Sequence, residues 1–470
     1  MNRLAFLVVA LAVIAAAPAG ALEWTALGPR AMGMGGAGVA AVQGPLASYW
    51  NPAALGRETE NAYGLQIPAG AHAALTGTVY EGAKNLKNLM DTCKGGTCTQ
   101  AQIDDALNKL NDPNNGLRID GGAGADFKIG QVALFANGFL DMGAVPTVDL
   151  VNKAPADIAG TSATPNQSKL TVRGARLLEF GAGWGHELPF APGVFVGGNL
   201  KLMQAQVGYA DYLVLQHNND QSNIVSKLKD GAKKSANFGI DLGALWDVQS
   251  TFEGAWWRPR IGLVGRNLNN PKFSQADAAA AAGVTGRYAV NPQVRLGGAI
   301  SPLNWWHFVS DVDLTENRTT IDSIKSRQLG VGTEVDVFNR TWVNIPLRFG
   351  VARNMANTEA GTMLTGGAGL NFLHFILDAS AQVSPKTIQT QSQGKTKKMP
   401  REFAAGVQLS LLFGGSSERA ATREPKPLPT LQADPFHPAQ PDELAPGQVE
   451  KVKENAEKAQ QELEKEESKH

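Results

Sequence analysis

The chain has 470 residues, with 43 lysines and arginines against 43 aspartates and glutamates, so its formal net charge is zero. That balance argues against a nucleic-acid binder, which needs a basic excess to neutralise phosphates. Hydrophobic residues make up 43% of the chain, yet after the first twenty residues no apolar stretch is long enough to cross a bilayer as a helix. Disorder throughout the chain and a polytopic helical membrane protein are therefore both excluded.

The N-terminus has the features of a secretory signal. Arg3 gives a positive start, residues 4–17 are an unbroken apolar run, and residues 19–21 (Ala-Gly-Ala) are small where a signal peptidase cuts. The alternative, a membrane anchor, requires about 20 apolar residues, more than this run has. We therefore expect residues 1–21 to be removed and the mature chain to lie outside the cytoplasm, where ATP and NAD are absent.

Residues 22–60 are rich in glycine and alanine and show little of the alternation that marks a strand. The run from Gly33 to Gly38 fits the spacing G-x-G-x-x-G, but a dinucleotide site needs a strand before this motif and a helix after it. Here a signal peptide precedes the motif and Pro45 soon follows. The glycines instead favour a compact segment with close backbone packing.

Between residues 61 and 413 the chain repeatedly alternates apolar and polar side chains with period two, as strands with one apolar face do. Phe238 and Leu242, for example, share one face of a predicted strand, and Asp241 falls on the other. We predict fourteen such strands, which start near residues 61, 118, 131, 169, 193, 236, 259, 293, 306, 327, 345, 361, 372 and 401. An open sheet edge in hydrocarbon would leave peptide groups unpaired. The predicted fold is therefore all-β, a closed antiparallel transmembrane β-barrel of about fourteen strands over residues 61–413.

The connections between the predicted strands differ in length. Those after odd-numbered strands are mostly long and those after even-numbered strands mostly short, which is typical of an outer-membrane barrel with both chain ends in the periplasm. Aromatic residues gather near the strand ends, where an interfacial girdle would lie: Trp184, Tyr209, Tyr212, Trp246, Trp256, Trp257, Trp305, Trp306 and Trp342. The alternative is that they form the core of a soluble protein; we favour the girdle.

Residues 81–117 carry short amphipathic helical patterns and the chain's two cysteines, Cys93 and Cys98. The Gly-Gly between the cysteines can bring the sulfurs together, and an oxidising compartment would keep the disulfide. A metal site would need two more ligands nearby, and a thioredoxin-like site would need the spacing C-x2-C. We expect a structural disulfide in a helical, extracellular insert.

The composition changes after Phe413. Seven prolines between Pro425 and Pro446 predict an extended spacer, and residues 446–470 predict a highly charged helix with no apolar stripe to bury. We expect residues 414–470 to form a solvated periplasmic tail; contact between this tail and an envelope protein is the alternative.

The chain shows no catalytic or metal-binding pattern. Its seven histidines lack metal-ligand spacing, and neither G-x-S-x-G nor a P-loop occurs. Six charged residues at inward strand positions are expected in the lumen: Arg266, Arg295, Asp311, Asp313, Glu334 and Arg348. An ion-pair network is the ordinary role of such charges, and catalysis is the alternative. We expect no enzymatic activity, no cofactor and no metal.

The motif from Arg30 to Ala37, followed by the run from Tyr49 to Leu55, resembles the N-terminus of FadL-like outer-membrane proteins, the superfamily that includes TodX. Residues 262–268, 310–314 and 345–351 look like the branch of that superfamily that holds PorV and the conjugal transfer protein TraF. In the fatty-acid transporters the Asn-Pro-Ala segment forms a hatch inside a fourteen-stranded barrel. The resemblance implies that residues 22–60 form such a hatch, or plug, with six motif residues in the lumen: Gly35, Gly36, Ala37, Asn51, Pro52 and Ala53.

Two hypotheses of function follow. The first is passive uptake of small hydrophobic molecules across the outer membrane of a Gram-negative bacterium. The second is a structural or assembly role in conjugation or secretion, suggested by the insert at 81–117 and the tail. An envelope hydrolase is disfavoured because no Ser/His pair stands out. The expected partners are outer-membrane lipids, a hydrophobic small molecule and, through the tail, envelope proteins, but no nucleic acid.

Overall fold

The computed structural model describes residues 24–57, 62–215, 224–252, 254–284, 286–320, 324–340, 342–356, 361–392 and 395–413. All of them belong to the first of two compact units, Met1–Glu418 and Arg419–His470. The expected signal peptide (1–21) and tail (414–470) lie outside the described residues. In the described part of the chain, no helix is both long enough and apolar enough to cross a membrane.

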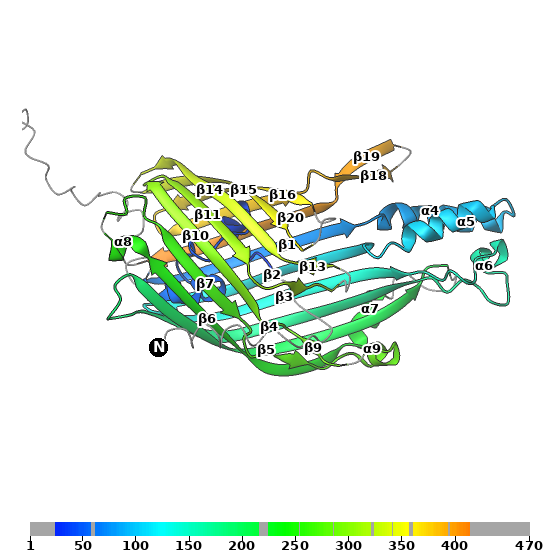
Figure 1. Cartoon of the computed structure of the whole chain (residues 1–470), viewed down its shortest axis with the longest axis horizontal. Coiled ribbons are helices and arrows are strands. Elements are labelled where there is room, and N and C mark those ends of the chain that lie inside the picture. The colour runs from blue at the N-terminus through cyan, green and yellow to red at the C-terminus, as the bar shows by residue number, and fades with distance from the viewer. Residues whose placement is uncertain are drawn as a thin grey trace, which may run out of the picture. The chain divides into compact units, whose positions relative to one another are not determined.

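Fourteen antiparallel strands close into one barrel (Figure 1). In order around the wall they are β1 (Tyr63–Thr76), β2 (Gly116–Ile129), β3 (Val132–Thr147), β4 (Lys169–Glu187), β5 (Val194–Leu213), β6 (Lys233–Asp247), β7 (Arg260–Arg266), β10 (Gln293–Leu303), β11 (Trp306–Asp313), β14 (Gln328–Asn339), β15 (Val343–Asn354), β16 (Thr362–Phe372), β17 (Phe375–Val383) and β20 (Glu402–Phe413). The last strand pairs with the first and closes the wall. Each start predicted from alternation lies within three residues of an observed start, so the predicted fold class is confirmed.

Smaller elements precede the wall or lie in its connections. The helices are α2 (Pro29–Gly33), α3 (Ala47–Trp50), η1 (Pro52–Gly56), α4 (Val79–Lys94), α5 (Gln100–Leu110), α6 (Pro155–Ala159), α7 (Ile224–Asp230), α8 (Val248–Thr251) and α9 (Asp277–Ala281). Three two-stranded hairpins pair β8 (Lys272–Phe273) with β9 (Tyr288–Ala289), β12 (Asn317–Arg318) with β13 (Lys325–Ser326), and β18 (Thr387–Ser392) with β19 (Lys395–Pro400). The sequence did not predict these hairpins.

The two ends of the barrel differ. We call the end with α4, α5, α6 and the hairpin β18–β19 the long-connection end (Figure 1). At the other end, the short-turn end, β2 and β3 are joined by Gly130 and Gln131 alone, and Gly130 takes the positive φ of 56° that this tight turn requires. β1 starts and β20 ends at the short-turn end, because Tyr63 lies opposite Phe413.

Side chains alternate between the two faces of the wall. On β5, Leu200 and Leu202 are 63% and 57% exposed, whereas Lys201 between them is 1% exposed. The outward apolar residues continue around the barrel and include Phe127, Leu134, Phe180, Phe238, Leu242, Leu263, Val331, Phe349, Leu364, Leu377, Val407 and Leu409. An apolar surface that encircles the wall is the outer face of a membrane-spanning barrel.

Exposed tryptophans lie at the short-turn end of the wall. They are Trp184, Trp256, Trp257, Trp305 and Trp342, and they are 43–70% exposed. Tyr209 was expected in the same girdle, but it is buried near the opposite end of β5 against Ala276 and Ala279. That expectation was wrong because Tyr209 lies on the same, inward face of β5 as Lys201, where the connection after β7 covers it.

Candidate functional site in the plugged lumen

Residues 24–57, which we call the plug, lie inside the wall (dark blue in Figure 1) and carry α2, α3 and η1. The Asn-Pro-Ala motif starts η1. The Asn51 Oδ1 atom accepts a hydrogen bond from the Ala53 N–H at 3.1 Å, and Pro52 occupies the first turn, where no N–H is needed. The Asn51 Nδ2 group donates to the carbonyls of Val39 in the plug and of Ala244 on β6. One fully buried side chain thus caps a helix and joins the plug to the wall.

The wall meets the plug through glycines. We call these residues the glycine belt: Gly185, Gly197, Gly243, Gly262, Gly297, Gly330, Gly332 and Gly350. A Cβ atom at Gly332 would lie 2.5 Å from Met34 Cα, and one at Gly350 would lie 2.6 Å from the Gly35 nitrogen. Since real Cβ atoms do not approach so closely, only glycine allows the plug backbone to lie directly on the wall.

Buried polar groups of the wall hydrogen-bond the plug backbone. The Asp311 carboxylate on β11 accepts hydrogen bonds from the Gly38 and Val39 N–H groups at 2.8 and 2.9 Å. On β16, the Thr365 hydroxyl accepts from the Gly35 N–H and donates to the Gly33 carbonyl. These bonds satisfy peptide groups that irregular backbone would otherwise leave unpaired.

An ion-pair chain links the plug to three strands. The Arg30 guanidinium, on α2, donates to both oxygens of Glu334 on β14, at 2.7 Å for the Nη2–Oε1 pair. Arg348 on β15 donates to the same carboxylate and to Asp378 on β17. Glu334 is therefore the shared acceptor of two arginines, one from the plug and one from the wall.

Two wall arginines stack on plug aromatics. The Arg266 guanidinium lies 4.1 Å from the centre of the Tyr49 ring, and that of Arg295 lies 4.4 Å from the Trp24 ring. Arg295 also pairs with Asp313 on the neighbouring strand at 2.6 Å. Stacking on a ring face lets a guanidinium keep its in-plane donors for carboxylates.

Two connections fold inward from the long-connection end. The connection 267–292, which carries β8, α9 and β9, places Phe273 and Tyr288 in the same apolar core as the plug. In the connection 314–327, the Thr320 hydroxyl donates to Asp141 on β3. The lumen is thus filled from both ends, whereas the sequence indicated only that these connections after odd-numbered strands are long.

A cavity of about 140 Å³ lies in the lumen. The plug supplies part of its lining, including Trp24, Met32 and Gly36. Apolar wall residues such as Ala74, Met363 and Ala404 line it together with charged residues, among them His72, Arg118, Asp120, Arg295, Asp311, Lys386, Arg401 and Glu402. The cavity therefore offers an apolar body with polar groups at fixed places.

The strongest polar cluster of the cavity lies at the seam where the wall closes. On β1, His72 Nδ1 lies 2.7 Å from Asp120 on β2, and His72 Nε2 lies 3.0 Å from Glu402 on β20. An ionised carboxylate only accepts hydrogen bonds, so donation from both ring nitrogens requires an imidazolium. Arg118 pairs with Asp120 and Asp141 beside it.

The structure places the residues expected from the sequence as follows. Gly35, Ala37 and Asn51 are buried in the plug, Gly36 lines the cavity, and Pro52 and Ala53 lie against the glycine belt. The six expected lumen residues, namely Arg266, Arg295, Asp311, Asp313, Glu334 and Arg348, are all at least 95% buried.

Sequence analysis missed several charged lumen residues. These are His72, Arg118, Asp120 and Glu402 around the cavity, and Lys201 between Glu179 and Asp241 deeper in the lumen. Each lies on a barrel strand, at a position whose side chain faces inward. The same alternation that predicted the strands could have placed them.

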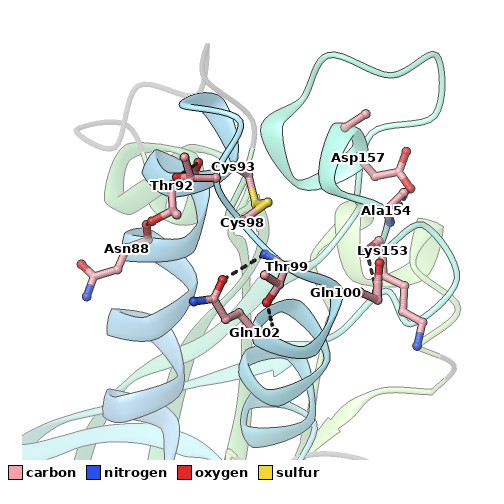
Figure 2. The surroundings of a disulfide bond; sticks show 12 residues. Asn88, Thr92, Cys93, Cys98, Thr99, Gln100, Gln102, Lys153, Ala154 and Asp157 are labelled. Atoms are coloured by element: carbon pink, nitrogen blue, oxygen red, sulfur yellow. Dashed lines mark hydrogen bonds between the residues drawn. A yellow bond between two sulfur atoms is a disulfide. The ribbon is translucent and has the colours of Figure 1, made fainter.

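The helical layer (α4, α5 and α6) stands at the long-connection end and has its own core, which includes Leu86, Ile103, Leu107 and Ile158. The expected disulfide between Cys93 and Cys98 joins the end of α4 to the start of α5, with a Cα–Cα distance of 4.6 Å (Figure 2). Thr99 and Gln102 form a capping box that starts α5. A disulfide and a capped helix fix the turn between the two helices.

Comparison with known proteins identifies the family. Residues 48–313 match the model of the family described as the TraF protein of the F plasmid transfer operon. The chain belongs to this family. The matched part of this TraF-family chain runs from α3 to β11 and so includes the end of the plug and nine strands of the wall. No curated protein sequence matches the chain at a significant level.

The solved structures that match the chain include two toluene transporters and a FadL homologue. The toluene transporter TbuX of Ralstonia pickettii shares 12% identity, with 82% of this chain and 98% of that one covered and a TM-score of 0.45. The toluene transporter TodX of Pseudomonas putida shares 10% identity over 82% and 98%, with a TM-score of 0.44. A FadL homologue of Pseudomonas aeruginosa shares 12% over 81% and 97%, with a TM-score of 0.39.

The described residues hold no group of three or more His, Cys, Asp or Glu side chains placed to bind a metal ion. The charged residues of the lumen are instead arranged in ion pairs and in hydrogen bonds to the plug. The chemistry that this arrangement supports is noncovalent binding in the cavity and attachment of the plug.

Proposed function

We propose that the chain is an outer-membrane protein of a Gram-negative bacterium that takes up small hydrophobic molecules by passive diffusion. The apolar outer face and the position of both ends of the wall at the short-turn end support this location. The observation that carries the proposal is the cavity, because Met32, Met363 and Ala404 give it an apolar lining inside the barrel. A ligand of this cavity has an apolar body and can carry one polar group.

Passage through the barrel requires movement of the plug. The plug contacts the wall around the lumen, through the glycine belt and through the Arg30–Glu334 pair. A ligand in the cavity can reach the short-turn end only when these contacts open. Binding and release are therefore separate steps, and the binding step can be measured alone.

The test uses a neutral naphthylamine dye and the full-length protein in liposomes. Ala404 is 2% exposed and lines the cavity, whereas Val407 on the same strand is 57% exposed on the outer face. We expect saturable dye binding by the natural protein, at least a tenfold loss of affinity in Ala404→Trp because the added indole fills the cavity, and no loss in the matched control Val407→Trp. Dye binding equal to that of empty liposomes, or equal in both variants, would overturn the proposal.

A role in plasmid transfer is the second candidate, and the family match favours it. A transfer component that acts through protein contacts would not need the cavity. In a host that transfers plasmids, Ala404→Trp would then leave the transfer frequency unchanged, whereas deletion of residues 419–470 would lower it. If uptake is the function instead, deletion of residues 419–470 should leave the transfer frequency unchanged, so this deletion distinguishes the two candidates.

A further inference from the structure

The cavity in the lumen is lined by polar groups of two kinds. Those of the first kind are paired within the protein: His72 lies between two carboxylates, and the Gln382 side chain donates to the Met32 carbonyl at 2.8 Å. The Thr76 hydroxyl likewise donates to the Gly116 carbonyl at 3.2 Å. Such groups do not need a ligand, because their hydrogen bonds are already made.

Polar atoms of the second kind have no hydrogen-bond partner among the described residues. They are the Trp24 Nε1 atom, the Thr25 Oγ1 atom and the Asp311 Oδ1 atom. All three residues line the cavity, and they are only 4%, 8% and 3% exposed. A buried polar group without a protein partner is costly, and in a cavity wall the partner that it needs is water or a ligand.

The three groups belong to one corner of the cavity, where the start of the plug meets β10 and β11. The Trp24 ring lies 4.4 Å from the guanidinium of Arg295 on β10, and Arg295 pairs with Asp313 on β11 at 2.6 Å. Asp311 precedes Asp313 by two positions, so both side chains lie on the same, inward face of β11. Thr25 follows Trp24 directly in the plug. We call Trp24, Thr25 and Asp311 the corner subsite.

The corner subsite contains both donors and acceptors. The Trp24 indole only donates hydrogen bonds, an ionised Asp311 only accepts them, and the Thr25 hydroxyl does either. The other carboxylate oxygen of Asp311 already accepts two N–H groups of the plug. A hydroxyl group both donates and accepts, so one such group on a ligand can pair with a donor and an acceptor of the subsite. A ligand carboxylate would instead bring a second negative charge close to Asp311.

We propose that the cavity binds small hydrophobic molecules that carry a hydroxyl group, such as phenols, and that the hydroxyl pairs with the corner subsite. This inference rests on the proposed function and adds the chemical class of its ligand. A hydrocarbon that displaces water from the subsite leaves buried polar groups unpaired. A site that hydrogen-bonds a ligand hydroxyl therefore rejects the analogue that lacks it, far more strongly than an apolar pocket discriminates by size alone.

The experiment measures binding of four one-ring ligands to the purified full-length protein by equilibrium dialysis, with the same detergent on both sides of the dialysis membrane. An apolar cavity of about 150 Å³ takes up benzene, so one-ring ligands suit a cavity of about 140 Å³. The ligands are 4-methylphenol, toluene, 4-methylanisole, which accepts but cannot donate a hydrogen bond, and the charged 4-methylbenzoate. We expect 4-methylphenol to bind about tenfold more tightly than each of the others.

Two variants test whether the corner subsite sets this preference. Thr25→Val removes the hydroxyl and Trp24→Phe removes the indole N–H, and each should lower the ratio of the 4-methylphenol affinity to the toluene affinity about fivefold. The matched control Thr76→Val removes a cavity hydroxyl that is already bonded to Gly116, so it should leave the ratio unchanged. Because a change in cavity volume acts on both ligands, it does not alter the ratio. Retained SDS resistance at room temperature, lost on boiling, shows that each variant has formed its barrel.

Three outcomes would contradict the proposal. They are binding of 4-methylphenol by the natural protein that is no tighter than binding of toluene, tighter binding of 4-methylbenzoate than of 4-methylphenol, and a ratio that changes no more in Thr25→Val and Trp24→Phe than in Thr76→Val. The first two do not depend on the folding of any variant. Equal, saturable binding of all four ligands would leave the uptake function in place, whereas failure of that function shows in the dye test with Ala404→Trp. The two proposals can therefore fail separately.

Discussion

The plug and the helical layer are both small helical segments held by the same wall, but different forces hold them. The backbone of the plug lies on the glycine belt, and ion pairs such as Arg30–Glu334 join the plug to the wall. The helical layer packs apolar side chains such as Leu86 and Ile103 in a core of its own. We therefore expect one added carbon or one lost charge to release the plug, whereas changes in the helical layer should leave the barrel unaffected.

Loss of the shared carboxylate should have the largest effect. Glu334→Gln leaves the buried guanidinium of Arg348 and the partly exposed one of Arg30 without their common carboxylate, and loss of a buried ion-pair partner costs up to about 3–5 kcal/mol. We expect faster hydrogen exchange throughout residues 24–57 and a lower temperature for loss of SDS resistance. The control Asp105→Asn removes the exposed pair with Lys109 in the helical layer, and it should cost less than about 1 kcal/mol. Equal effects of the two variants would contradict the distinction between the two regions.

Adjacent glycines on β10 test the close approach of the plug. A Cβ atom at Gly297 would lie 2.8 Å from Val39 Cβ, whereas one at Gly298 would meet no atom within 4 Å. Gly297→Val should destabilise the plugged state by up to about 3 kcal/mol through overpacking, and Gly298→Val should be tolerated. Hydrogen exchange of the plug amides measures the difference, and similar exchange in both variants would show that the belt is not needed.

Removal of the disulfide should affect only the helical layer. The Cys93→Ser/Cys98→Ser variant loses a cross-link over a short loop, which contributes about 2 kcal/mol to the local structure. We expect proteases to cleave between residues 77 and 115 sooner, while the barrel keeps its SDS resistance and the plug its exchange rates. Reduction of the natural protein should give the same result. A shift in the SDS resistance of the barrel would mean that the two regions are coupled.

The smallest effect concerns Asp149 in the connection 148–168. Burial alone would raise the pKa of this carboxyl, but hydrogen bonds from the Asn152 side chain and from the Gln167, Asn152 and Val151 N–H groups lower it to about 2. A lowered pKa stabilises the loop above the usual value of about 4, and this stabilisation is lost as the pH falls through 2. Protease cleavage of the connection should stay slow down to about pH 4 and rise below it. In Asp149→Asn the rate should not change over this range.

The sequence predicted the wall because the two faces of each strand meet different surroundings. Leu200 and Lys201 are neighbours in the chain, yet one faces lipid and the other the lumen, and this contrast repeats around the barrel. The resemblance to FadL-like proteins added the plug, because Asn51 and Pro52 recur in that motif. Both inferences depend on short-range features of the sequence: the alternation of adjacent residues and a short motif.

The contacts inside the lumen could not be predicted from any single segment, because they depend on strand register and on how the plug docks. Arg295 and Asp313 lie directly opposite each other, so this pair follows once the register of β10 and β11 is known. Arg30 reaches Glu334 across 304 positions of the chain, and only the docked plug brings them together. His72 was passed over because its spacing from other histidines carried no pattern, while its partners Asp120 and Glu402 lie on the two flanking strands.

The seam between β1 and β20 has a consequence for biogenesis. The wall becomes a closed ring only when residues 350 positions apart, Tyr63 and Phe413, come together. The plug precedes β1 in the chain, so it is made before every strand that will surround it. Because the plug backbone lies directly on wall glycines, the closed barrel leaves little space for the plug to enter afterwards. The simplest order of assembly is therefore that the wall forms around the plug, and pairing of β20 with β1 then closes the barrel.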